Sequence, residues 1–252
     1  MTATGAFPRK ELHEIVRTWR IWVVSGMMVF LAIASPIMAL LLPVLVGSLV
    51  GDGITIEIPE PTLVDSYRQF FKNLTQIVLV ALIVTGAGSI PGERKQGSAV
   101  LVLSKPLSRA GFVIAKLISQ LGLLVASAAV GAVLCWIVTA LLFDGAPLGP
   151  VAQATGLWLS YAAVLVAAVT LTSAALNSQV GAAGIRLGVY FSLLSLGAWS
   201  WAANHTFAGL AAAADTVLTG VAVSTSWPLV TALATVLVLS GAAALSFGRK
   251  EL

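Results

Sequence analysis

The side chains that most often perform catalysis or bind metals are few in this chain of 252 residues, and they are scattered. Neither His13 nor His205 has a Cys, Asp or Glu at metal-ligand spacing on the same helix face. Cys135 is the single cysteine, so no disulfide pair can form within the chain. No paired carboxylates and no G-x-S-x-G turn occur, which leaves hydrolase chemistry without support. We therefore expect no catalytic residue and no metal or cofactor bound by this chain.

The lysines exclude ATP binding through a P-loop. That motif needs Gly-Lys followed by Ser or Thr, because the backbone amides, the lysine and the hydroxyl hold the phosphates and magnesium. The six lysines are followed instead by Glu11, Asn73, Gln96, Pro106, Leu117 and Glu251. An ATP-driven activity of this chain would therefore require an ATPase on a separate chain.

The clearest concentration of charge is the segment GERKQGSAVLVLSKPLSR, residues 92–109. It holds four of the fourteen Lys and Arg residues in a chain with only 10% charged residues. Pro91 and Gly92 end the preceding apolar stretch, since neither suits a continuing helix. The segment therefore leaves the membrane and lies on its aqueous side.

Within this segment we expect a short amphipathic helix that starts near Gly97 and carries Val100 and Leu101 on its apolar side. Pro106 halts it, because the residue before a proline avoids the right-handed helical region. Ser108 can cap the next helix. Such a helix could be an interfacial anchor, or a coupling element that inserts into a groove of a cytosolic partner and passes its movement to the flanking spans.

The composition indicates one integral membrane domain, residues 1–252, of all-α class. The chain is 58% hydrophobic, with a mean hydropathy of +0.99. Soluble domains are about 45–50% apolar and about 25% charged. The net charge of +4 does not indicate nucleic acid, because the basic residues stand at the edges of apolar stretches rather than along one stripe.

Six transmembrane helices are expected, because about 20 apolar helical residues cross a bilayer core. Pro36 and Pro43 fall in the first, where we expect a kink. The additional apolar stretch 204–227 has Asp215 near its centre, at a cost of about 2.5–3.5 kcal/mol in a span. Short helices between spans 5 and 6, on the outer side, fit that stretch better than a seventh span. The six expected spans cover residues 21–46, 72–90, 112–143, 152–176, 183–203 and 228–247.

The distribution of Lys and Arg predicts the orientation. Twelve of the fourteen fall on one side of this layout, and only Arg68 and Lys72 fall on the other. The positive-inside rule then places both termini and residues 92–109 in the cytoplasm. Residues 7–20 have apolar side chains at helical spacing, which predicts an interfacial helix before the first span.

The stretch GERKQGSAVLVLSKPLSRAGFVIAK, residues 92–116, resembles the signature of ABC-2 type permeases, the membrane subunits of a class of ATP-binding-cassette exporters. Ser98 stands where that family usually has Thr, and Ala115 where it usually has Gly. The matching residues are Gly92, Glu93, Arg94, Gly97, Leu103, Ser104, Pro106, Ser108, Arg109 and Lys116.

The resemblance implies a multi-pass protein of the cell (inner) membrane that acts as a permease and is not itself an enzyme. Two permease copies, identical or different, would form the pathway, and two cytosolic P-loop ATPase subunits carrying ATP and magnesium would drive export. Glu93 and Arg94 would contact the ATPase, and Val100 and Leu101 would seat the helix in its groove. The full set of coupling residues implied is Glu93, Arg94, Gly97, Val100, Leu101, Pro106, Ser108 and Arg109.

Two alternatives from other classes remain open at this point. A transporter or channel that works without ATP would need a polar lining, and the spans offer only scattered Ser, Thr and Asn177. Ion-coupled transporters usually keep ionisable residues within their spans, whereas Arg186 is expected near the end of one. A non-transporting membrane anchor would use residues 92–109 only to recruit partners. The sequence does not indicate the substrate.

Overall fold

The computed structural model describes residues 19–49, 59–86, 109–176 and 179–248, and within these ranges the regular structure is entirely helical. The elements, in chain order, are α2 (Trp19–Leu49), α3 (Leu63–Asn73), the π-helical turn η1 (Leu74–Val78), α4 (Leu79–Gly86), α7 (Arg109–Leu142), α8 (Leu148–Ala175), α9 (Gln179–Ala198), α10 (Ser200–His205), the 3-10 turn η2 (Phe207–Gly209), α11 (Leu210–Leu218) and α12 (Ser226–Gly248).

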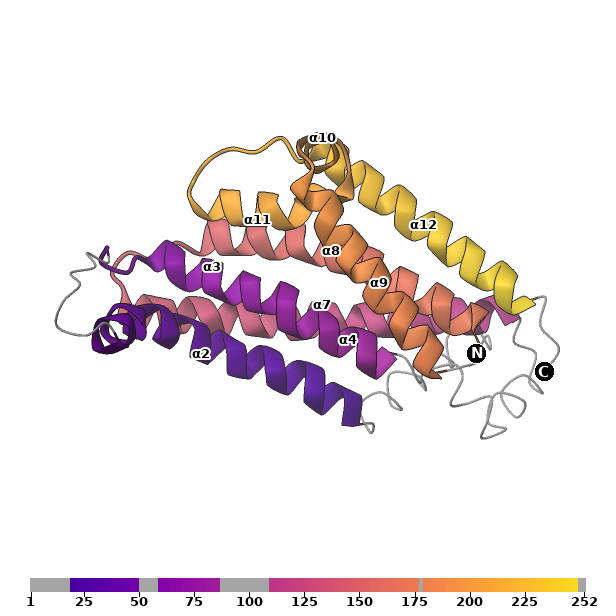
Figure 1. Cartoon of the computed structure of the whole chain (residues 1–252), viewed down its shortest axis with the longest axis horizontal. Coiled ribbons are helices and arrows are strands. Elements are labelled where there is room, and N and C mark those ends of the chain that lie inside the picture. The colour runs from indigo at the N-terminus through magenta and orange to yellow at the C-terminus, as the bar shows by residue number, and fades with distance from the viewer. Residues whose placement is uncertain (1–18, 50–58, 87–108, 177–178, 249–252) are drawn as a thin grey trace, which may run out of the picture.

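Within the described residues, four helices are long and apolar enough to cross a membrane. They are α2, α7, α8 and α12, and they correspond to the first, third, fourth and sixth expected spans. Pro36 and Pro43 both lie inside α2 without ending it, and Figure 1 shows this helix changing direction toward its C-terminal end.

The second and fifth expected spans are helical but differ from the prediction. The second begins at Leu63, nine residues early, and passes from α3 through η1 into α4. A capping box starts α3: Asp65 accepts hydrogen bonds from the Thr62 backbone N–H (2.9 Å) and hydroxyl (2.6 Å), while the Thr62 hydroxyl caps the Asp65 N–H. The fifth breaks at Trp199, whose extended backbone separates α9 from α10.

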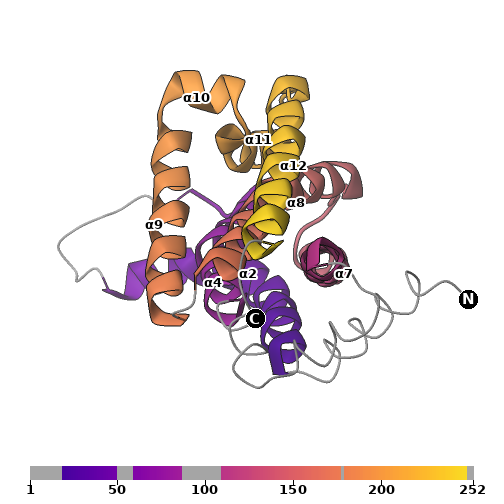
Figure 2. The same ribbon diagram turned by 90° about the vertical axis from the view of Figure 1, so that its right-hand side faces the viewer.

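The long helices run side by side along the longest axis of the molecule (Figure 1). The end of α4, the start of α7, the end of α8 and the end of α12 lie at one end of this bundle (Figure 1). Figure 2 shows α9 standing across the other helices and leading to α10. We call the end that holds the α4 C-terminus the inner end, and the opposite one the outer end.

α8 is the central helix of the bundle. It packs against α7, α11 and α12 and also contacts α4 and α9. Trp158 and Tyr161 are among its fully buried side chains. Polar side chains join other helices: Asn73 of α3 donates to the Ser35 hydroxyl of α2 (3.0 Å), as hydrogen bonds between membrane helices often do.

The stretch 204–227 folds as short helices, as expected, rather than as one span. α10, η2 and α11 follow one another at the outer side of the bundle (Figure 1). Gly209 is required where η2 meets α11, because a Cβ there would lie 1.8 Å from the carbonyl oxygen of Ala203. This close approach lets η2 pack directly against the backbone of α10, immediately before α11 begins.

Candidate functional site

Seven of the eight predicted coupling residues fall at positions 87–108, outside the described residues, and the expected interfacial helix 7–20 falls almost wholly outside them as well. The eighth, Arg109, is the first residue of α7. The coupling role therefore stays a prediction. The described elements do show that α4 ends and α7 begins at the same, inner end of the bundle (Figure 1).

The first turns of α7 pack against the last turn of α12. Phe112 stacks on Phe247 with ring centroids 5.6 Å apart. Lys116, which also matches the family signature, is buried, and its ammonium nitrogen lies 5.3 Å from the centroid of the Phe112 ring. This distance is within the range of a cation–π interaction. The helix that follows the predicted coupling segment is thus anchored at the inner end.

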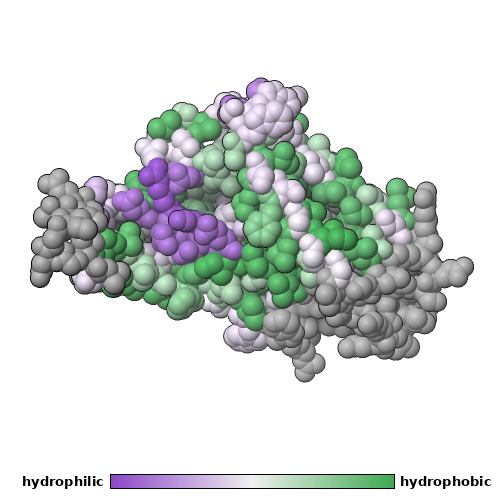
Figure 3. Space-filling model, viewed as in Figure 1, coloured by the Kyte–Doolittle hydropathy of each residue, from purple (hydrophilic) through white to green (hydrophobic). Residues whose placement is uncertain are grey.

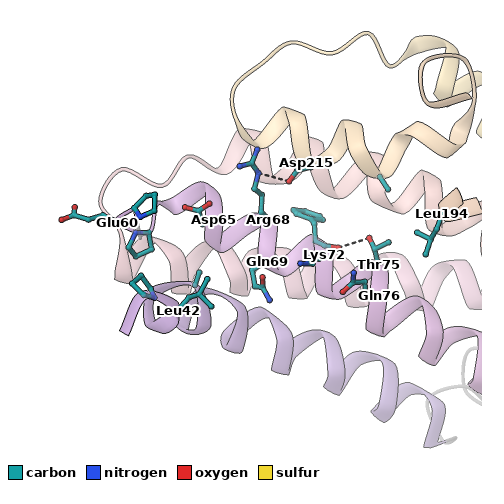
Figure 4. A pocket seen from close by; sticks show the side chains of 16 residues that line it. Leu42, Glu60, Asp65, Arg68, Gln69, Lys72, Thr75, Gln76, Leu194 and Asp215 are labelled. Atoms are coloured by element: carbon teal, nitrogen blue, oxygen red, sulfur yellow. Dashed lines mark hydrogen bonds and ion pairs between the residues drawn. The ribbon is translucent and has the colours of Figure 1, made fainter. Parts of the chain in front are cut away.

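A polar surface of the described chain lies toward the outer end. Figure 3 shows hydrophilic residues gathered in one patch, with hydrophobic residues around it. A cavity of about 700 Å³ opens there between α2, α3, η1, α9 and α11. We call it the polar groove; its polar lining residues are Glu60, Asp65, Arg68, Gln69, Lys72, Thr75, Gln76 and Asp215. Most come from successive turns of α3 and η1, which face the groove (Figure 4).

One ion pair crosses the groove. The Arg68 Nε donates to Asp215 Oδ1 at 3.0 Å, so α3 is joined to α11. Both side chains are about half exposed, at 45% and 48%. Lys72, one turn further along α3, is exposed and has no ion-pair partner among the described residues. In the described part of the groove, Lys72 is therefore a cation that no carboxylate pairs with directly.

A π-helical turn ties the groove wall to the centre of the bundle. In η1 the Leu79 N–H bonds to the Leu74 carbonyl, five residues back. The Thr75 carbonyl accepts a hydrogen bond from the Tyr190 hydroxyl of α9 at 2.8 Å. The Thr75 hydroxyl accepts one from the Trp158 indole of α8 at 3.1 Å. Single π-turns often occur at functional sites, and this one places Thr75 and Gln76 along the groove.

Arg186 is the second unusual charge. It was expected near the end of a span, and in the structure only 1% of it is exposed. Its Nε donates to the Thr172 hydroxyl and its Nη2 to the Ser173 hydroxyl, both at 2.7 Å. These residues stand in the last turn of α8, where the free carbonyls carry partial negative charge that stabilises a cation.

Neither feature was identified as a site from the sequence. The sequence did contain an indication of the groove, because Arg68 and Lys72 were the two basic residues expected on the outer side. It also contained an indication of Arg186, which is a charged residue inside an apolar stretch. The sequence could not predict the tertiary packing, which places Asp215 next to Arg68 and places α9 next to the end of α8. Among the residues that the structure describes, no three His, Cys, Asp or Glu side chains are grouped so as to hold a metal ion.

Comparison with known proteins identifies the family. A family model described as "ABC-2 family transporter protein" matches residues 7–216, which include the predicted coupling segment and the polar groove. The chain is also 25% identical over 174 residues to the transmembrane protein YxlG of Bacillus subtilis (strain 168), a match that covers 66% of this chain and 67% of that protein. Because the family model covers well over half of its length, this chain belongs to the ABC-2 family of membrane transporter proteins.

Proposed function

We propose that this chain is the permease subunit of an ABC exporter: it forms the substrate pathway with a second permease copy, and two separate cytosolic ATPase subunits drive it. The observation that carries this proposal is the family match over residues 7–216, in a chain whose sequence holds no P-loop. ATP and magnesium then belong to the partner ATPase, and this chain converts the movement of that partner into a change of its helices.

Six membrane crossings are part of this proposal. Besides the four long apolar helices, α3, η1 and α4 together run 24 residues from Leu63 to Gly86. At 1.5 Å per residue this is about 36 Å, longer than a bilayer core of about 30 Å. α9, with 20 residues, is about 30 Å long. Six crossings would return the C-terminus to the side of the N-terminus.

The inner end is the proposed docking surface for the ATPase, in the cytoplasm. α4 ends and α7 begins there, and the end of α8, the start of α9 and the end of α12 lie at the same end (Figure 1). A short helix within residues 92–109, held by spans on both sides, would transmit the motion of the ATPase to α4 and α7.

An ATP-independent channel gains less support. Such a channel needs polar side chains along the whole crossing. In the described residues the polar lining of the groove extends from Glu60 only as far as Gln76, and the core beyond it is built of apolar side chains such as Val78, Leu79 and Ile83.

The experiment is to tag the chain in its native host, purify it in mild detergent and identify its stoichiometric partners. We expect a soluble P-loop ATPase that is lost when Glu93→Arg and Arg94→Glu are combined. The matched control is the pair Glu60→Arg and Arg68→Glu, which reverses one acid and one base at the outer end and should retain the ATPase. A chain that purifies without any ATPase, even after crosslinking, would overturn the proposal in favour of a scaffolding or passive role.

A further inference from the structure

The charges of the polar groove are ordered along its length. Glu60, Asp65 and Asp215 lie in its outer part, where Arg68 is the only cation among the described lining residues. Lys72 lies one turn deeper, followed by the amide of Gln76 (Figure 4). Leu194 of α9 lies at the innermost part of the cavity (Figure 4). The groove is therefore acidic outside, basic further in, and apolar at its deep end.

The depth of Lys72 in the bilayer follows from its position relative to α8. This helix has 28 residues, or about 42 Å, which matches a bilayer including both headgroup regions. Trp158 stands ten residues after its outer start and bonds to Thr75, so Thr75 lies about 15 Å in. Lys72 precedes it by almost one turn, about 10 Å in, from where its flexible side chain reaches the boundary between headgroups and acyl chains.

An anionic partner would stabilise an ammonium group at this level. A charge near the hydrocarbon region is costly unless it is paired or faces water, and no described carboxylate pairs with Lys72. Leu194, at the deep end of the groove beyond Lys72, suits an acyl chain rather than bulk water (Figure 4). A molecule that fits has an anion at the level of Lys72, a cation nearer the outer acids, and an apolar tail.

We propose that the polar groove binds a zwitterionic phospholipid of the adjacent leaflet, with its phosphate at Lys72, its ammonium group toward Asp215 and Glu60, and an acyl chain along Leu194. In such a lipid the phosphate lies deeper than the ammonium group, which is the order that the groove complements. The cavity of about 700 Å³ is in the usual size range of ligand pockets. This binding does not depend on transport or on an ATPase, so it can fail separately from the proposed function.

The test is a lipid titration of the purified, delipidated full chain, read by native mass spectrometry. The probes are phosphatidylethanolamine, phosphatidylglycerol, diacylglycerol and the water-soluble glycerophosphoethanolamine. We expect phosphatidylethanolamine to bind about tenfold more tightly than diacylglycerol, which lacks the phosphate and its charge-assisted hydrogen bonds. Equal binding of phosphatidylglycerol would overturn the zwitterionic assignment, and equal binding of glycerophosphoethanolamine would overturn the membrane as the source of the ligand.

Matched variants locate the site. Lys72→Gln should weaken phosphatidylethanolamine binding about tenfold, and Lys72→Arg should retain it, because the arginine keeps the charge. Gln69→Glu, which adds a carboxylate beside Lys72 in the groove, should weaken binding. Gln153→Glu makes the same change on α8, in a different cavity, and should not. Unchanged binding by Lys72→Gln, or an equal loss in Gln69→Glu and Gln153→Glu, would place the lipid elsewhere.

Discussion

Arg68 and Arg186 lie toward opposite ends of the bundle, and their guanidinium groups are held in different ways. Arg68 is 45% exposed and pairs with a carboxylate, that of Asp215. Arg186 is 1% exposed and bonds to two neutral hydroxyls at the end of α8. The outer charge keeps access to water and can exchange partners, whereas the inner charge depends on the packing of α8 against α9. This contrast is consistent with ligand binding in the polar groove at the outer end, and with Arg186 stabilising the packing of α8 against α9 at the inner end.

The largest effect is expected from Arg186→Glu. A buried carboxylate would face the partial negative charge at the end of α8, and an uncompensated buried charge costs about 3–5 kcal/mol. Arg186→Met, which fills a similar volume without charge, should cost much less. Thermal unfolding of the purified chain in detergent measures both. Equal losses in the two variants would show that Arg186 acts through its volume and not through its charge.

An intermediate effect is expected from Tyr190→Phe. The change removes the hydroxyl that donates to the Thr75 carbonyl at the π-turn, and one such hydrogen bond contributes about 0.5–1.5 kcal/mol. Ser192→Ala is the control on the same helix, because the exposed Ser192 hydroxyl bonds to the Gly188 carbonyl of its own helix and to no other described residue. Its effect on the unfolding temperature should be close to zero. If both variants unfold alike, the π-turn is held by other contacts.

The smallest effect is expected from breaking the ion pair of Arg68 and Asp215. Exposed pairs contribute about 0–1 kcal/mol, and salt screens them. A double-mutant cycle with Arg68→Gln and Asp215→Asn should therefore give a coupling free energy within that range that decreases at high salt. A larger coupling that is insensitive to salt would mean that the groove is closed to water, and the contrast between the two arginines would then disappear.

Much of the fold was predictable because a bilayer imposes one clear signal on the sequence. The apolar lengths of α2, α7, α8 and α12 follow from membrane thickness, and Asp215 correctly excluded a span through 204–227. The start of α3 was not predicted, since the capping box of Thr62 and Asp65 extends a helix into a polar stretch that hydropathy does not mark.

The candidate site was predictable only in part. The family was confirmed by the match over residues 7–216, but the coupling residues stay predictions, because all except Arg109 fall outside the described residues. The polar groove could not be derived from the sequence, since it joins Arg68 to Asp215 across 147 positions. The pairing depends on where η2 places α11, and no local pattern encodes that packing.

The most direct test of this account asks whether the two ends of the bundle face different compartments. In a Cys135→Ala background, a single cysteine is placed at Asp144, exposed in the connection between α7 and α8, or at Ser108, within the predicted coupling segment. A membrane-impermeant maleimide should label Asp144→Cys in intact spheroplasts, and Ser108→Cys only after permeabilisation. Labelling of Ser108→Cys in intact spheroplasts would contradict a cytoplasmic coupling segment, and with it the proposal that a cytosolic ATPase drives this permease.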